Sequence, residues 1–217
     1  MKCRIERIIV FTANEEKNEV PFNSGLNIIS GVSQTGKSAV IEIIDYCLAS
    51  TTSSIPKGVI EDNSILYSII LDIGKNYIIL ARRPYYFNIR EQIGKGRIFF
   101  KVESKKDFNC GEISYKYFEK NKYSFIPIDD VKKELEKFLN ISVYKQAIYE
   151  DNEVKTERVS IRNMVSFLFQ HQNLVANKFA LFYRFDDSMK RKKTIMQFPI
   201  FLGLVDQRYY ELLQLKE

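Results

Sequence analysis

The first fifth of the chain alternates short β-branched and aromatic runs with polar turns. Runs at 4–12 and 18–22 predict an antiparallel strand pair, and the run at 26–30 predicts a third strand after the turn Asn23-Ser24-Gly25. From residue 40 onward the spacing of apolar residues changes to three and four positions. This spacing predicts a helix that is buried on one side, with apolar positions Val40, Ile41, Ile43, Ile44, Cys47 and Leu48.

The middle of the chain predicts a mostly antiparallel block. Two β-branched runs, 64–72 and 76–83, flank Ile73-Gly74-Lys75 and predict a hairpin, and 97–103 predicts a further strand. Residues 129–139 predict a helix, because acidic residues stand at its start and apolar ones recur along one side.

The last third of the chain is harder to interpret. We expect a loop over the polar residues 145–160. Ser160 is a candidate cap for a helix over 161–169, although 164–169 would equally suit a buried strand; we expect the helix. Residues 206–217 have a helical composition and include no Gly, Asn or Pro that would cap a helix.

Composition allows one sizeable domain or two small ones, since 45% of the 217 residues are hydrophobic. The three cysteines share no metal or redox spacing, and no run has the length of a membrane span or the core of a signal peptide. We therefore expect a soluble, cytoplasmic protein without a membrane partner. The net charge of +6 is compatible with a polyanionic partner. The basic cluster 190–193 fits either a phosphate-backbone contact or the solvated start of a helix, and we expect the latter.

Residues 31–38 carry the most specific chemistry, because they form a complete G-x-x-x-x-G-K-[ST] phosphate loop between a predicted strand and a predicted helix. The loop amides and the helix N-terminus would hold the β-phosphate. Lys37 would bridge the β- and γ-phosphates, and Ser38 would place its hydroxyl on Mg²⁺. We therefore predict an ATP·Mg²⁺ site formed by Gly31, Val32, Ser33, Gln34, Thr35, Gly36, Lys37, Ser38 and Ala39.

A phosphate loop also needs an acidic residue at the end of a second hydrophobic strand, and neither candidate is convincing. Asp72 follows Ile69-Ile70-Leu71 but opens a hairpin turn, and Ile73 stands where a catalytic glutamate would be expected. Asp129 and Asp130 follow Pro127, which argues against a central strand, and they suit a helix N-terminus better.

Two other classes of site are disfavoured. Asn177-Lys178 is followed by Phe179-Ala180, so the Asn-Lys-x-Asp motif that reads guanine in GTPases is not formed there. His171 is the sole histidine, which excludes a multi-histidine metal site.

In the order in which its motifs follow one another, the sequence resembles the N-terminal half of an SMC-type ABC ATPase head. It is similar to RecN, RecF and the double-strand-break repair ATPases, and in particular to bacterial SMC-like ATPases of anti-phage defence operons. The resemblance rests on the strand pair, the phosphate loop, the helix over 41–48, the hairpin ending in Arg82-Arg83, and residues 167–174 as a Q-loop that contains Gln170.

The resemblance implies an α/β P-loop fold with an antiparallel β-subdomain, a half-head over 1–205, and a coiled-coil helix that starts at 206–217. It implies Gln170, with Gln172 as the alternative, as the ligand of Mg²⁺ or the attacking water. The signature motif and the missing acid would come from a C-terminal half-head. ATP would join two heads into a homodimer on DNA, associated with the nucleoid, and an effector nuclease is a further expected partner.

Two other functions stay open at this stage. One is a small-molecule kinase with Asp72 or Asp129 as the base and the 190–193 cluster in a lid. The other is a scaffold that senses ATP without hydrolysing it and recruits a nuclease.

Overall fold

The structure is a computed structural model, and it describes residues 3–32, 35–85, 96–139, 141, 145–150, 153–169, 182, 185–205, 208 and 212. The chain divides into two compact units, residues 1–131 and 132–217. The division falls within helix α5 (Ile128–Phe138), and each unit is described by itself. The proposed boundary at residue 205, between a half-head and a coiled coil, stays a prediction.

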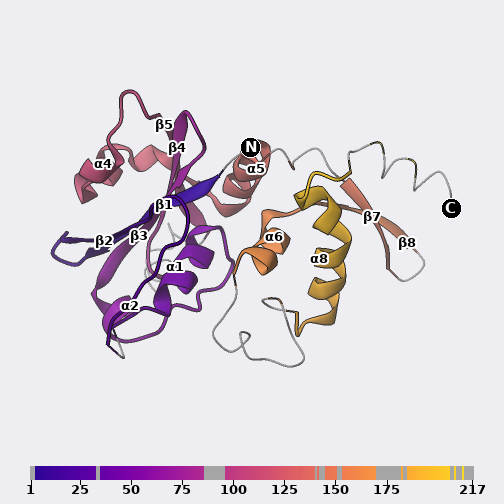
Figure 1. The fold of residues 1–217 in the computed structure, drawn as a ribbon, viewed down its shortest axis with the longest axis horizontal. Helices are drawn as coiled ribbons and strands as arrows, with labels where there is room; N and C mark the ends of the chain where they lie inside the picture. Colours follow the sequence, from indigo (N-terminus) through magenta and orange to yellow (C-terminus); the bar gives the residue numbers. More distant parts are fainter. Residues whose placement is uncertain are drawn as a thin grey trace. The chain divides into compact units, whose positions relative to one another are not determined.

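The first unit is built on a six-stranded antiparallel sheet with the order β2-β1-β3-β4-β5-β6 (Figure 1). The predicted strand pair and hairpin are confirmed, and so is the strand after them. Only the short edge strand β6 was not predicted. The bounds are β1 Arg4–Thr12, β2 Lys17–Pro21, β3 Ser64–Asp72, β4 Asn76–Arg82, β5 Arg97–Ser104 and β6 Phe125–Pro127.

Both faces of this sheet are covered, which explains its continuous runs of apolar residues. One face packs against a 3₁₀ turn η1 (Cys110–Glu112) and helix α4 (Tyr115–Lys120), in a core that includes Phe11, Phe99 and Phe118. The opposite face packs against helix α1 (Ala39–Cys47), which contacts β3 and β4. Alternate residues of a strand point to opposite faces, so each strand contributes to both cores.

Helix α1 confirms the helix predicted after the phosphate loop. Its buried side includes Ile43, Ile44 and Cys47, at the spacing expected for a helix that lies on a sheet. Burial raises the pKa of the Cys47 thiol to about 12, so this cysteine contributes to the packing of the core and is not a nucleophile. A five-residue helix α2 (Val59–Asn63) leads from α1 into β3.

The strand predicted at 26–30 is wrong, because this segment has no strand conformation in the structure. Asn27 closes the preceding turn instead: its side chain accepts from the Asn23 N–H at 2.8 Å and donates to the Asn23 carbonyl at 2.9 Å. Leu26 and Ile28 are 88% and 80% exposed. The apolar pattern is present, but no neighbouring strand pairs with it among the described residues.

The second unit contains a hairpin and two helices. The loop predicted over 145–160 is wrong, since these residues form the antiparallel pair β7 (Lys145–Glu150) and β8 (Glu153–Arg158). Their polar composition concealed the strands, because a two-stranded ribbon has no sheet neighbours that demand an apolar face.

The predicted helix near 161–169 is confirmed as α6 (Ile161–Leu168), and the Ser160 hydroxyl caps it by accepting from the Arg162 N–H. A 14-residue helix α8 (Ser188–Phe201) packs on α6, where Asn163 Nδ2 donates to Gln197 Oε1 at 2.9 Å and the rings of Phe167 and Phe198 lie 4.5 Å apart. The basic cluster 190–193 lies in the first turns of α8, as expected.

No helix in the described part of the chain is long and apolar enough to cross a membrane. The predicted helix over 206–217 lies almost wholly outside the described residues, apart from residues 208 and 212.

Candidate nucleotide-binding site

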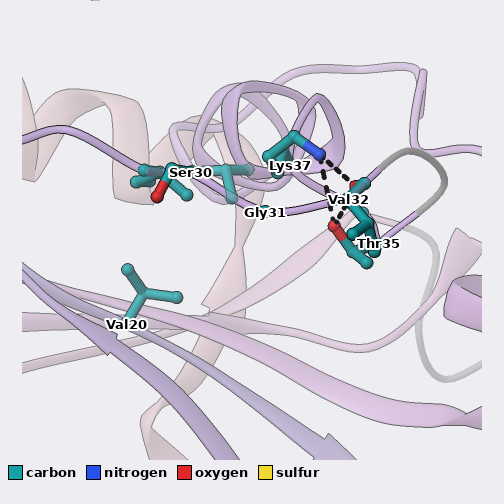
Figure 2. A pocket seen from close by; sticks show the side chains of 9 residues that line it. Val20, Ser30, Gly31, Val32, Thr35 and Lys37 are labelled. Carbon is teal, nitrogen blue, oxygen red and sulfur yellow. Dashed lines mark hydrogen bonds between the residues drawn. The ribbon is translucent and has the colours of Figure 1, made fainter.

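The phosphate loop wraps around the side chain of Lys37. The Lys37 ammonium donates to the Val32 carbonyl and, at 3.3 Å, to the Thr35 hydroxyl (Figure 2). The Thr35 hydroxyl in turn donates to the Val32 carbonyl at 2.9 Å. These bonds place the Lys37 ammonium over the loop. From this position it could reach a bound phosphate group.

The backbone favours glycine strongly at Gly36 and more weakly at Gly31. Gly36 has φ of +82°, which strains any residue with a side chain, and a Cβ there would lie 3.1 Å from Ile60 Cδ1. A Cβ on Gly31 would lie 3.3 Å from Thr35 Oγ1. Both glycines of the motif therefore fit the tight loop that a nucleotide cradle requires.

The turn passes directly into helix α1. The Ala39 N–H donates to the Gly36 carbonyl at 3.0 Å, and the helix begins at Ala39. Ser38 precedes it with an exposed side chain that makes no capping hydrogen bond. Its hydroxyl is therefore placed at the helix N-terminus, where the predicted Mg²⁺ ligand belongs.

A pocket of about 440 Å³ opens at this loop, within the range of about 300–1,000 Å³ that is usual for ligand sites. Sequence reasoning missed four lining residues, whose types gave no sign of a site: Val20 from β2, Ile29 and Ser30 before the loop, and Val40 from α1. The lining is Val20, Ile29, Ser30, Gly31, Val32, Thr35, Gly36, Lys37 and Val40, and these described residues include no carboxylate (Figure 2).

Several predicted site residues lie outside the described residues: Ser33 and Gln34 of the phosphate loop, and the Q-loop candidates Gln170 and Gln172. Their roles stay predictions. Within the described part of the chain, no group of three or more His, Cys, Asp or Glu residues is placed to hold a metal ion.

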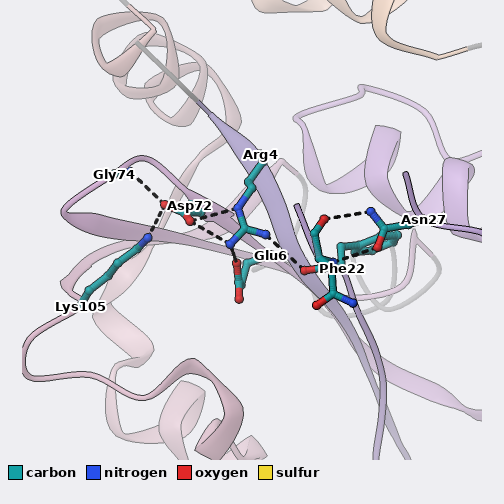
Figure 3. A network of polar contacts seen from close by, with 8 residues as sticks. Arg4, Glu6, Phe22, Asn27, Asp72, Gly74 and Lys105 are labelled. Carbon is teal, nitrogen blue, oxygen red and sulfur yellow. Dashed lines mark hydrogen bonds and ion pairs between the residues drawn. The ribbon is translucent and has the colours of Figure 1, made fainter. Parts of the chain in front are cut away.

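Asp72 belongs to a structural network, as its place at a hairpin turn predicted. Its carboxylate accepts from Arg4 at 3.2 Å, from Lys105 and from the Gly74 N–H at 2.9 Å (Figure 3). Arg4 also donates to the Phe22 carbonyl at 3.2 Å, at the start of the segment that leads to the phosphate loop. Burial would raise the pKa of Asp72, but the bonds from Lys105 and Gly74 and the charges of Lys105 and Arg4 lower it overall.

Neither Asp72 nor Asp129 lines the pocket at the phosphate loop. Asp129 lies in the first turn of α5, where an acidic side chain stabilises the helix N-terminus. These placements leave the kinase hypothesis without a described base beside the phosphates.

The fold and the loop define the class of protein: an α/β domain with a P-loop nucleotide site and an antiparallel six-stranded sheet. A comparison with protein families is more specific. Residues 2–217, nearly the entire chain, match the AAA domain family, and the chain belongs to this family of nucleotide-binding P-loop ATPases. No curated protein and no solved structure matched the chain in the corresponding searches.

Proposed function

We propose that this chain is the ATP-binding part of an SMC-like ATPase head that dimerises on ATP and acts on DNA, in bacterial anti-phage defence or DNA repair. The observation that carries the proposal is that Lys37 and the described residues of the phosphate loop line a pocket whose described lining holds no carboxylate. Hydrolysis requires an acid to order Mg²⁺ and a base to activate water. In this proposal another segment or subunit supplies both.

The segment before the loop supports the same proposal. Leu26, Ile28 and Ile29 are 88%, 80% and 42% exposed, although the sequence of this segment is typical of a buried strand. Exposed apolar groups that have no partner strand among the described residues invite pairing with another strand. A C-terminal half-head would supply that strand, with the missing acid at its end.

In this mechanism each group has a separate task. Lys37 would exchange the Val32 carbonyl for the β- and γ-phosphates, Ser38 would hold Mg²⁺, and Gln170 or Gln172 would contact the metal or the attacking water. A second head completes each site through its signature motif. Closure of the heads is driven by ATP binding, and their release by hydrolysis.

Size-exclusion chromatography with light scattering tests this proposal on the full-length protein. We expect a dimer of heads in Mg·ATP and monomeric heads in Mg·ADP, and a Lys37→Ala variant should stay monomeric in both. The matched control is Lys57→Ala, which removes an exposed lysine that does not line the pocket. Identical profiles in ATP and ADP would contradict dimerisation on ATP, and turnover by Lys37→Ala at the wild-type rate would contradict the mechanism.

A further inference from the structure

Arg82 is an almost fully buried cation on the face of the sheet that α1 covers. Only 2% of it is exposed, and it ends β4, paired in register with Tyr67 of β3. A charge at this depth is costly unless it is well hydrogen-bonded. The bonds of Arg82 therefore indicate what this residue holds in place.

Its guanidinium binds the C-terminal end of the phosphate-loop helix. Nη1 donates to the Tyr46 carbonyl at 3.1 Å and to the Ser50 carbonyl, and the guanidinium carbon lies 3.9 Å from the centre of the Tyr46 ring. The last carbonyls of a helix have no donor within the helix and form its negative end. The buried guanidinium of Arg82 gives these carbonyls a donor and places a positive charge at the negative end of the helix.

A further hydrogen bond runs from α1 to the end of β4. The Tyr46 hydroxyl donates to the Arg83 carbonyl at 2.9 Å, so helix and strand each bind the other's backbone. The Tyr46 ring also packs edge-on against Tyr67, with centroids 6.2 Å apart. The C-terminal end of α1 is therefore fixed to the β3–β4 hairpin by the Arg82 cation, an edge-on ring contact and the Tyr46 hydroxyl.

The other end of the same helix carries Lys37 and Ser38. Helix α1 has nine residues, about 13 Å, and a helix this short moves as a rigid rod. Fixing its C-terminus therefore sets the height and rotation of its N-terminus over the pocket. We propose that Arg82 is a positioning residue for the nucleotide site, which holds α1 so that the loop amides, Lys37 and Ser38 face the phosphates. This inference rests on the proposed nucleotide binding.

A purely structural Arg82 would affect stability and leave nucleotide affinity unchanged. The test compares Arg82→Met, which keeps the length of the side chain, with Arg82→Lys, which keeps the charge and a donor. The matched control is Ser68→Ala in the same hairpin. Ser68 is fully buried and its hydroxyl donates to the Leu80 carbonyl at 2.9 Å, so its loss destabilises the sheet without touching α1.

Affinity for Mg·ATPγS is measured on the full-length protein, well below the unfolding temperature of every variant. We expect Arg82→Met to weaken binding about tenfold, Arg82→Lys to recover part of the loss, and Ser68→Ala to change affinity less than about twofold. Wild-type affinity in folded Arg82→Met would overturn the inference, and so would an equal loss in Ser68→Ala.

Amide hydrogen exchange over 39–44 gives a readout that needs no nucleotide. We expect faster exchange at this N-terminal part of α1 in Arg82→Met and no change there in Ser68→Ala. If the wild-type protein binds no nucleotide, the proposed function fails by itself. In that case faster exchange confined to Arg82→Met still supports the link between Arg82 and the loop end of α1, and unchanged exchange overturns it.

Discussion

At the scale of single residues, the chain holds a strained position outside its glycines. Glu15 has φ of +61° in the turn between β1 and β2, where the Glu15 N–H donates to the Thr12 carbonyl at 2.8 Å. A left-handed conformation costs a residue with a side chain roughly 1–2 kcal/mol, and glycine avoids this cost.

We therefore expect Glu15→Gly to raise the free energy of unfolding by about 0.5–1 kcal/mol, because the strain relief exceeds the added entropy of the unfolded chain. The exposed neighbour Glu16→Gly is the control, and it should lower stability, because no positive φ is present there. Urea unfolding measures both variants. A loss of stability in Glu15→Gly would contradict the inference that the backbone of Glu15 is strained.

Asp72 provides a pH-dependent prediction. Its pKa is lowered in the folded state, so its contribution to stability is present above the ordinary value of about 3.8 and is lost as the pH falls through the folded pKa. We expect Asp72→Asn to destabilise the protein by about 1–2 kcal/mol at pH 7, because the charged bonds to Arg4 and Lys105 weaken.

The difference between Asp72→Asn and wild type should shrink as the pH falls below about 3.8 and be lost below the lowered pKa of folded Asp72, where both side chains are neutral. Asp107→Asn, at an exposed acid in the turn after β5, should change the stability very little at any pH. Thermal unfolding as a function of pH measures both. A destabilisation of Asp72→Asn that does not vary with pH would mean that the charge of Asp72 is not the cause.

At the scale of elements, the sequence predicted structure best where local signals and packing agree. The hairpin β3–β4 and helix α1 combine strong propensity with buried faces, and their bounds were nearly correct. Segment 26–30 has the same apolar pattern but no partner strand among the described residues, and a pattern cannot reveal what it will pair with. The prediction for β7–β8 was wrong in the opposite way, since residues of mostly polar sequence form a strand pair there.

The same contrast applies to the candidate site. Spacing alone was enough to place Gly31, Gly36, Lys37 and Ser38 around one turn. The walls of the pocket and the link from Arg82 to α1 depend on residues distant in sequence, such as Val20, which no motif marks.

The basic turns of α8 give a prediction at this scale. Arg191 and Lys192 are exposed there, so a phosphate backbone could reach both cations. If the protein acts on DNA, the double variant Arg191→Ala, Lys192→Ala should bind DNA more weakly. It should also reduce the slope of log affinity against log salt by about 2.

The control for α8 removes two exposed lysines from α4, in the variant Lys116→Ala, Lys120→Ala. It should change the salt slope less than the α8 variant does. Fluorescence anisotropy with duplex DNA over a range of salt concentrations measures both. Equal salt slopes for the two variants would contradict a specific contact between α8 and DNA.

At the scale of the whole molecule, the proposed function makes this chain one part of a larger ATPase. In that proposal the chain contributes the phosphate loop, helix α1 and the sheet on which α1 packs. The carboxylate that orders Mg²⁺ and the base that activates water are expected from a partner half-head. The chain by itself should therefore bind ATP weakly and hydrolyse it negligibly.

The most direct test of the central claim is calorimetric titration of this 217-residue chain with Mg·ATPγS. We expect binding that Lys37→Ala weakens about tenfold or more and Lys57→Ala leaves unchanged, because Lys37 lines the pocket and Lys57 does not. No binding by the wild-type chain, or equal binding by the wild type and Lys37→Ala, would contradict nucleotide binding at this loop.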